Sequence, residues 1–186
     1  MKLYMIRHGE SEANVAGIIN DDPVRPVNLT ESGRRQARDA VATLAGIQFT
    51  RVYASRFPRA RQTAEILLHG LGLDLPILQD ARLDERRSGL DGRPVEAFNG
   101  LVRPDPLGIK PERGESFLEQ MERLRSFLDE LAGCQTDATI LAVSHENPIL
   151  AVTALAGRNP EDAARGGIGN CEWLFLEWPC QRSLTS

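Results

Sequence analysis

The sequence has little lysine, little cysteine and few aromatic residues, and it has no long apolar run. Two of its 22 basic residues are lysines, Lys2 and Lys110, so the other 20 are arginines. The formal net charge of −4 excludes a globally basic binder of nucleic acid or of membrane surfaces. The N-terminal apolar run is too short for a signal peptide, and no stretch approaches the about 20 residues of a membrane span.

The three cysteines, Cys134, Cys171 and Cys180, are too few and too widely spaced for a disulfide framework. A single Cys171–Cys180 pair stays open. Reduced thiols without a targeting segment predict a cytoplasmic protein with no membrane partner. The length of 186 residues predicts one domain, residues 1–186, that buries a core without disulfides.

Strand patterns and helix patterns alternate along the chain, and this alternation predicts the fold class. Apolar runs predict strands at 3–6, 52–54, 75–78, 138–143 and 173–176, and helical periodicity predicts helices at 30–45, 58–69, 116–131 and 148–156. The result is an α/β fold, a three-layer α/β/α sandwich with a mostly parallel central sheet. Residues 10–28 are expected to be loop, and residues 80–114 to be a partial cap with little regular structure.

Charged residues follow three of the predicted strands. Arg7 and His8 follow the first strand, Arg59 lies in the first turn of the helix after the second, and His145 follows the apolar run 138–143. Ligands bind outside the carboxyl ends of parallel strands, so we expect these side chains to converge. Two arginines, two histidines and the helix N-termini beside them suit a phosphoryl group. The arginines would repel a metal ion, and no G-x-S-x-G elbow indicates a serine hydrolase.

Six short motifs occur in order along most of the chain. They are Arg7-His8-Gly9-Glu10-Ser11-x-x-Asn14, Leu29-Thr30-x-x-Gly33-x-x-Gln36-Ala37, Ser55-x-x-x-Arg59-Ala60-x-Gln62-Thr63-Ala64, Leu83-x-Glu85-x-x-x-Gly89-x-x-Gly92, Gly114-Glu115-Ser116 and Val143-Ser144-His145. Together they resemble the histidine phosphatases, the phosphoglycerate-mutase-like superfamily. R-H-G alone would be a weak signal, whereas six motifs in order are a specific one.

The resemblance implies a role for each of these residues. His8 would attack phosphorus, and Arg7, Arg59 and a cationic His145 would hold the phosphoryl oxygens. Asn14 would add a hydrogen bond to the phosphate. Glu85 would protonate the leaving oxygen and then activate water. No metal and no organic cofactor is required.

The sequence offers two candidates for the acid, because Asp84 and Glu85 are adjacent and only one is expected to face the pocket. The family pattern favours Glu85. Three nearby arginines, Arg82, Arg86 and Arg87, are expected to depress its pKa unless they face substrate or solvent. This predicts an activity optimum at mildly acidic pH.

The segment after the second histidine departs from the family pattern. Many relatives have small glycines there, whereas this chain has Glu146-Asn147-Pro148. The backbone N–H of Glu146 would still donate to phosphate. Its carboxylate is expected to turn away, because it would repel an anionic substrate. A second departure is Asp91 where glutamate is common.

Hydrolysis is favoured over phosphoryl transfer between substrates. A mutase needs an extensive lid, and only about 28 residues separate Glu85 from Gly114. We therefore expect a phosphomonoesterase acting on a small phosphorylated metabolite, with phosphoglycerate mutase-type transfer as the alternative. A non-catalytic module that binds phosphate or a phosphopeptide is the alternative of another class. Arg87 and Arg93 are weak candidates for binding a second anionic group of the substrate. The apolar last strand is expected in the core, with a homodimer edge as the alternative.

Overall fold

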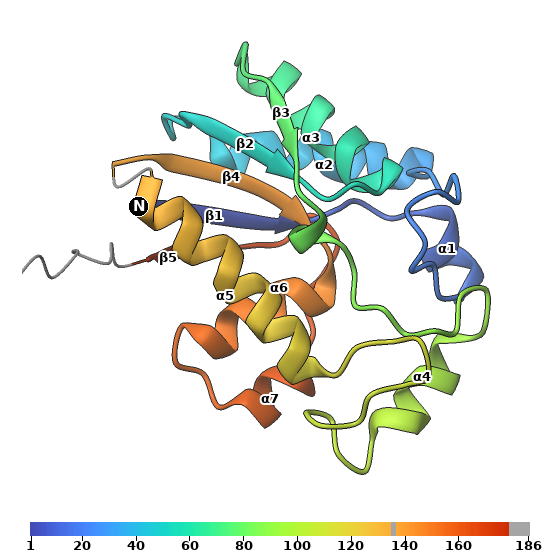
Figure 1. Cartoon of the computed structure of the whole chain (residues 1–186). Coiled ribbons are helices and arrows are strands. Elements are labelled where there is room, and N and C mark those ends of the chain that lie inside the picture. The colour runs from blue at the N-terminus through green and yellow to red at the C-terminus, as the bar shows by residue number, and fades with distance from the viewer. Residues whose placement is uncertain (135–136, 179–186) are drawn as a thin grey trace, which may run out of the picture.

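The computed structural model describes residues 1–134 and 137–178 (Figure 1), so Cys180 and its pairing with Cys171 lie outside the described residues. The strands are β1 (Lys2–Arg7), β2 (Arg51–Ala54), β3 (Ile77–Gln79), β4 (Thr139–Ser144) and β5 (Trp173–Glu177). The helices are α1 (Glu12–Ala16), α2 (Glu31–Leu44), α3 (Pro58–Leu71), the 3-10 turn η1 (Ala81–Leu83), α4 (Val95–Val102), α5 (Phe117–Cys134), α6 (Glu146–Leu155) and α7 (Pro160–Ala164). None of the described helices is long and apolar enough to cross a membrane.

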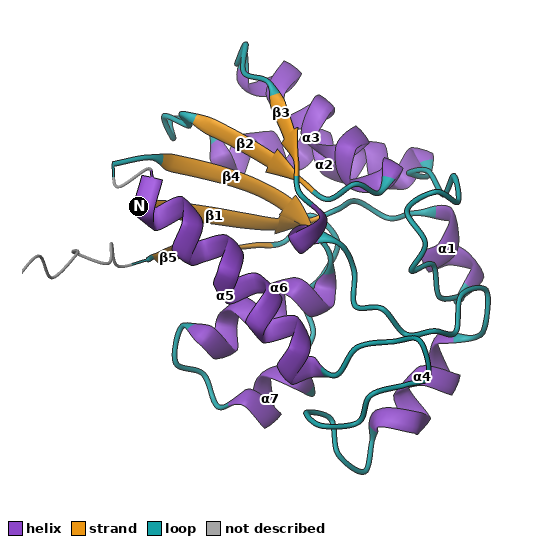
Figure 2. Ribbon diagram, in the orientation of Figure 1, coloured by secondary structure: helices purple, strands orange, loops and turns teal. Residues whose placement is uncertain are grey.

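The five strands form one sheet in the order β3-β2-β4-β1-β5, and only β5 runs antiparallel to its neighbour (Figure 2). Helices α2 and α3 pack together on one side of the sheet, and α5 and α6 pack together on the other. The predicted α/β/α sandwich with a mostly parallel sheet is confirmed.

Alternation of side chains along the strands builds two separate cores. Leu3 and Met5 of β1 join the cluster on the α5–α6 side, whereas Ile6 joins the cluster on the α2–α3 side. In β4, Ile140 and Leu141 divide in the same way. Both faces are covered, which is why the central residues of these strands are apolar.

Three local expectations were wrong. The segment 10–28 contains α1, which Ser11 and Asn14 start with a reciprocal capping box and which is too short to show periodicity. The segment 80–114 contains α4, whose first N–H, from Val95, donates to the carbonyl of Gly17 at 3.1 Å. The helix predicted at 58–69 ends at Gly72 in a left-handed conformation, because Gly70 remains helical and packs against Val41.

The last strand is only partly core. Leu176 is buried, but Phe175 is 45% exposed and packs against the ring of Tyr4 with 4.8 Å between centroids. Among the described strands, β5 lies at the edge of the sheet, and pairing of two copies along it stays a prediction.

Candidate active site

A cavity of about 430 Å³ opens at the carboxyl ends of the parallel strands, on the side where the long connections and α4 lie (Figure 1). Six of the residues named from the sequence line it: Arg7, His8, Asn14, Arg59, Glu85 and Glu146. The structure therefore brings together side chains that come from four separate segments of the chain.

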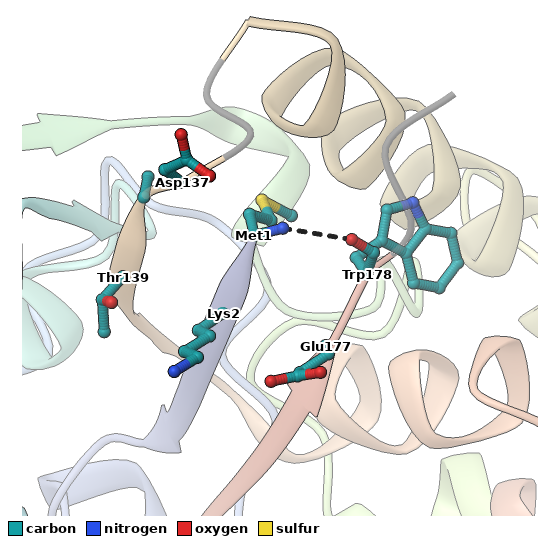
Figure 3. Close-up of a pocket in the computed structure, with 7 residues that line it drawn as sticks. Met1, Lys2, Asp137, Thr139, Glu177 and Trp178 are labelled. Atoms are coloured by element: carbon teal, nitrogen blue, oxygen red, sulfur yellow. Dashed lines mark hydrogen bonds between the residues drawn. The ribbon is translucent and has the colours of Figure 1, made fainter. Parts of the chain in front are cut away.

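A larger cavity, of about 620 Å³, lies where β1 begins, at the opposite end of the sheet (Figure 3). The ammonium group of Met1 donates there to the carbonyl oxygen of Trp178 at 3.2 Å. No histidine or arginine is among its described lining residues. Of these two cavities, the one at the carboxyl ends has the arginines and the histidine that suit a phosphate.

The tautomer of His8 follows from its two hydrogen bonds. Nδ1 lies 2.7 Å from the carbonyl oxygen of Gly9, which can only accept, so Nδ1 carries the proton. Nε2 is then unprotonated and accepts from Nε of Arg59 at 3.0 Å. Burial, reinforced by the Arg59 guanidinium, holds the pKa of His8 well below its usual range. His8 is therefore neutral at neutral pH, with a lone pair on Nε2.

Arg59 connects the two histidines. Besides His8, it donates through Nη2 to Nδ1 of His145 at 3.2 Å. Its position follows from the short connection between β2 and α3, which begins with Pro58 at the first helical position. Burial lowers its pKa to about 10, so the guanidinium stays charged at neutral pH.

His145 is fully buried beside His8, with 5.0 Å between the ring centroids. Nε2 donates to Oγ of Ser55 at 2.8 Å, since Nδ1 must accept from Arg59. Burial, followed by the charge of Arg59, holds the pKa of His145 well below its usual range. In this structure His145 is neutral and does not line the cavity, so a cationic His145 requires a bound anion.

The motif residues around His8 fix the loop that carries it. A Cβ added to Gly33 would lie 2.0 Å from the carbonyl oxygen of Glu10, so this close approach of α2 to the loop requires glycine. Gln36 accepts from the N–H of Glu10 at 2.8 Å. Thr63 accepts from the N–H of Gly9 at 3.1 Å. These side chains hold the loop that carries His8 without facing the cavity.

Residues 3–183 match the sequence profile of the family described as the histidine phosphatase superfamily (branch 1). The chain belongs to this superfamily. An adenosylcobalamin/alpha-ribazole phosphatase of Salmonella typhimurium is 34% identical over 158 residues, covering 78% of this chain and 74% of the relative. A 2,3-bisphosphoglycerate-dependent phosphoglycerate mutase of Thermoplasma acidophilum is 33% identical over 184 residues, covering 97% and 89%.

Solved structures of this superfamily share the fold. The mycobacterial glucosyl-3-phosphoglycerate phosphatase, in complex with VO3, matches with a TM-score of 0.81 at 27% identity, covering 94% of this chain and 90% of that chain. A putative alpha-ribazole-5'-P phosphatase of Escherichia coli matches with a TM-score of 0.78 at 29% identity, covering 94% and 89%. Phosphatases thus recur among the relatives of this histidine phosphatase.

The two adjacent carboxylates have separate surroundings. Asp84 accepts from Oγ of Ser55 at 2.9 Å and pairs with Arg56 at 2.6 Å. Through Ser55 it is linked to His145, so it orients that ring. Glu85 instead lines the cavity with His8 and Arg59. The geometry favours Glu85 over Asp84 as the group that meets a substrate.

The expected depression of the Glu85 pKa by nearby arginines was wrong. Burial raises the pKa of Glu85 above its usual range, while the N–H of Arg86 and the charge of Arg59 reduce this rise. Arg82 pairs with Asp80 at 2.6 Å, and Arg87 is held by Glu115, so their charges are compensated elsewhere. A raised pKa suits a carboxyl group that must donate a proton near neutral pH.

The carboxylate of Glu146 does not turn away from the cavity, contrary to expectation. It lies 3.2 Å from Nη1 of Arg7 and lines the cavity with it. Glu146 is the first residue of α6, so its N–H has no intrahelical partner and is available to an anion. Asn14 also lines the cavity. Its Oδ1 accepts from the N–H of Ser11 at 2.9 Å, and its amide nitrogen is available to a ligand.

The two weak candidates for binding a second anionic group are not brought to the cavity. Arg87 is 64% exposed and pairs with Glu115 at 3.3 Å. Arg93 is exposed and is absent from the residues that line the cavity. Among the described residues, no group of three or more histidines, cysteines or carboxylates could hold a metal ion.

Two asparagines with evident positioning roles were missed. Asn20 is buried, and its Oδ1 accepts from Nη1 of Arg59. Asn170 donates to the backbone carbonyl of His8 at 2.9 Å. Both lie in irregular segments outside the six motifs, so no periodicity or motif points to them.

Proposed function

We propose that this histidine phosphatase hydrolyses phosphomonoesters of small molecules through a phosphohistidine on His8. The observation that carries the proposal is the tautomer of His8: the carbonyl of Gly9 holds the proton on Nδ1 and leaves Nε2 as a nucleophile beside Arg59 and Glu85. A histidine of this kind splits one difficult displacement into two easier steps.

In the first step, Nε2 of His8 bonds to phosphorus and the bond from phosphorus to the ester oxygen breaks. Glu85, whose pKa is raised by burial, gives its proton to the leaving oxygen. The guanidinium groups of Arg7 and Arg59 stabilise the equatorial oxygens, together with Asn14 and the N–H of Glu146. His145 becomes cationic as the dianion binds, because an opposite charge favours its protonated form.

In the second step, the carboxylate of Glu85 takes a proton from water. The water oxygen attacks phosphorus, the bond to Nε2 breaks, and inorganic phosphate leaves. Each proton and electron pair is accounted for by His8, Glu85 and water, and no metal or organic cofactor takes part.

The remainder of the cavity supports a substrate whose alcohol part has apolar surface. Val95 and Phe98 of α4 and Ile19 line it beside the polar groups. The names of relatives support a small phosphorylated substrate, since alpha-ribazole phosphate and glucosyl-3-phosphoglycerate are both phosphorylated small molecules. The site supports a small phosphorylated molecule as the partner. It supports neither nucleic acid nor a membrane as a partner.

Mutase-type transfer is the second candidate, because the Thermoplasma acidophilum relative covers 97% of this chain. A phosphoglycerate carries a carboxylate besides its phosphate; Arg87 and Arg93 do not face the cavity to receive it, but Arg86 lines it. Hydrolysis is placed first because phosphatases recur among the relatives.

A panel of phosphorylated metabolites, including 3-phosphoglycerate with its bisphosphate primer, tests the proposal. We expect release of inorganic phosphate that is lost in His8→Ala and reduced in Glu85→Ala, with acid-labile label on His8 after an alkaline quench. His69→Ala, which alters the exposed histidine at the end of α3, is the matched control. Binding of phosphate without turnover would instead favour the non-catalytic module, and turnover in His8→Ala would overturn the nucleophile.

A further inference from the structure

Glu146 places a second carboxylate in the cavity that Glu85 also lines. Its Oε2 lies 3.2 Å from Nη1 of Arg7, and the two side chains are 33% and 16% exposed. Within residues 1–134 and 137–178, this is the one ion pair of Arg7. The charge that Arg7 would offer a phosphate is therefore already compensated.

Several features keep the carboxylate in this position. Glu146 opens α6, where a negative charge is favoured by the helix dipole. Its Oε1 lies 3.3 Å from the point where a Cβ of Gly167 would stand, so a side chain at 167 would press on it. Arg7 in turn donates to the backbone carbonyl of Ile168, next to Gly167. The pair is thus seated against the 167–168 segment.

A carboxylate and a phosphate accept hydrogen bonds from the same kinds of donor. Both are bound by the guanidinium fork and by N–H groups at a helix N-terminus. A phosphate that reaches Arg7 must displace the carboxylate or lie beside it, and either costs free energy because the charges are alike. Glu146 therefore lowers the affinity of the site for every anion that binds to Arg7.

We propose that Glu146 is a resident anion that competes with phosphate for Arg7 and so limits how tightly inorganic phosphate is held. The inference rests on the proposed function, in which phosphate is the product. A hydrolase that bound its product as strongly as the arginines allow would be slowed by product release. Glu146 therefore lowers the affinity for the product phosphate, and this allows faster product release.

The test is the binding of inorganic phosphate, measured by titration calorimetry. We expect Glu146→Gln, which keeps the shape and removes the charge, to bind phosphate about tenfold more tightly. The matched control is Glu161→Gln, which removes the same charge from the first turn of α7, at an exposed position outside the cavity. An unchanged affinity in Glu146→Gln overturns the proposal.

A double-mutant cycle with Arg7→Ala separates competition from general repulsion. Competition predicts that Glu146→Gln tightens phosphate binding less when Arg7 is absent. An equal gain in both backgrounds overturns competition for Arg7. Calorimetry requires no turnover, so failure here leaves His8-dependent hydrolysis standing, and loss of the proposed activity leaves the binding result standing.

Discussion

Asn20 holds the guanidinium of Arg59 with two oxygen atoms. Its Oδ1 accepts from Nη1, and its backbone carbonyl accepts from Nη2 at 3.1 Å. The third donor, Nε, faces His8. Arg59 is therefore aimed at the nucleophile by a residue outside the catalytic motifs.

Replacing Asn20 with alanine removes the side-chain acceptor and keeps the backbone one. A hydrogen bond to a charged group contributes about 1.5–3 kcal/mol, so we expect kcat/KM to fall roughly tenfold or more. Steady-state kinetics with an unchanged melting temperature would confirm it. Asn159→Ala, which removes an asparagine that caps α7, should leave kcat/KM unchanged. Wild-type kinetics in Asn20→Ala would show that Arg59 needs no such support.

The pH dependence of activity should report Glu85. Burial raises its pKa, so the carboxyl group keeps its proton to higher pH than an ordinary glutamate, and protonation of the leaving oxygen fails only above that raised value. On the acid side, the pKa of His8 is lowered. Its imidazole therefore stays neutral at pH values at which an ordinary histidine would be protonated.

The measurement is a rate profile from about pH 5 to pH 9 with two substrates. With an alkyl phosphate, whose leaving group needs a proton, we expect kcat/KM to fall on the alkaline side. With p-nitrophenyl phosphate, whose leaving group does not, this limb should be absent. A flat profile with the alkyl phosphate, or an identical limb in Glu85→Gln, contradicts the assignment.

The convergence of the site side chains could be predicted, because apolar runs in the sequence show where each strand ends. Arg7 and His145 follow apolar runs, and adjacent parallel strands bring them to one edge. The environment of each group could not be predicted in this way. The burial of His145 and the pairing of Glu146 depend on neighbours such as Ser55 and Arg7 that only the packed chain supplies.

The short motifs contain two kinds of residue, those that line the cavity and those that do not. Gln36 and Gln62 belong to motifs and never reach the cavity, since they accept from the backbone N–H groups of Glu10 and Leu29. Asn20 belongs to no motif and contacts Arg59. Helix α4 was not predicted, because its start depends on a hydrogen bond to Gly17, which is distant in sequence. Tertiary contacts decided each of these cases.

A buried ion pair fixes the segment that carries Glu85. Glu115 is 1% exposed and lies 2.5 Å from Nη2 of Arg123, whose Nη1 donates to the backbone carbonyls of Arg82 and Asp84 at 2.7 and 3.1 Å. Arg123 thereby joins α5 to the residues immediately before Glu85.

Arg123→Gln should loosen this segment and misplace the acid. We expect hydrolysis of an alkyl phosphate to fall about tenfold more than hydrolysis of p-nitrophenyl phosphate, because only the former needs the proton of Glu85. Arg125→Gln, in the same helix but half-exposed and paired only at 3.9 Å with Glu122, should change neither rate. An equal loss on both substrates would mean that Arg123 supports the fold and does not position Glu85.

The approach of Gly33 to the nucleophile loop can be tested by stability. A Cβ on Gly33 would lie 2.0 Å from the carbonyl oxygen of Glu10, and neither backbone can yield without moving the residues after His8. We expect Gly33→Ala to lower the free energy of unfolding by about 3 kcal/mol and to reduce turnover in the fraction that folds. Gly100→Ala, inside α4 with nothing within 4 Å of the added atom, should instead be neutral or stabilise by roughly 0.5–1 kcal/mol. Urea denaturation of both variants gives the comparison, and equal midpoints would show that the loop accommodates a side chain at Gly33.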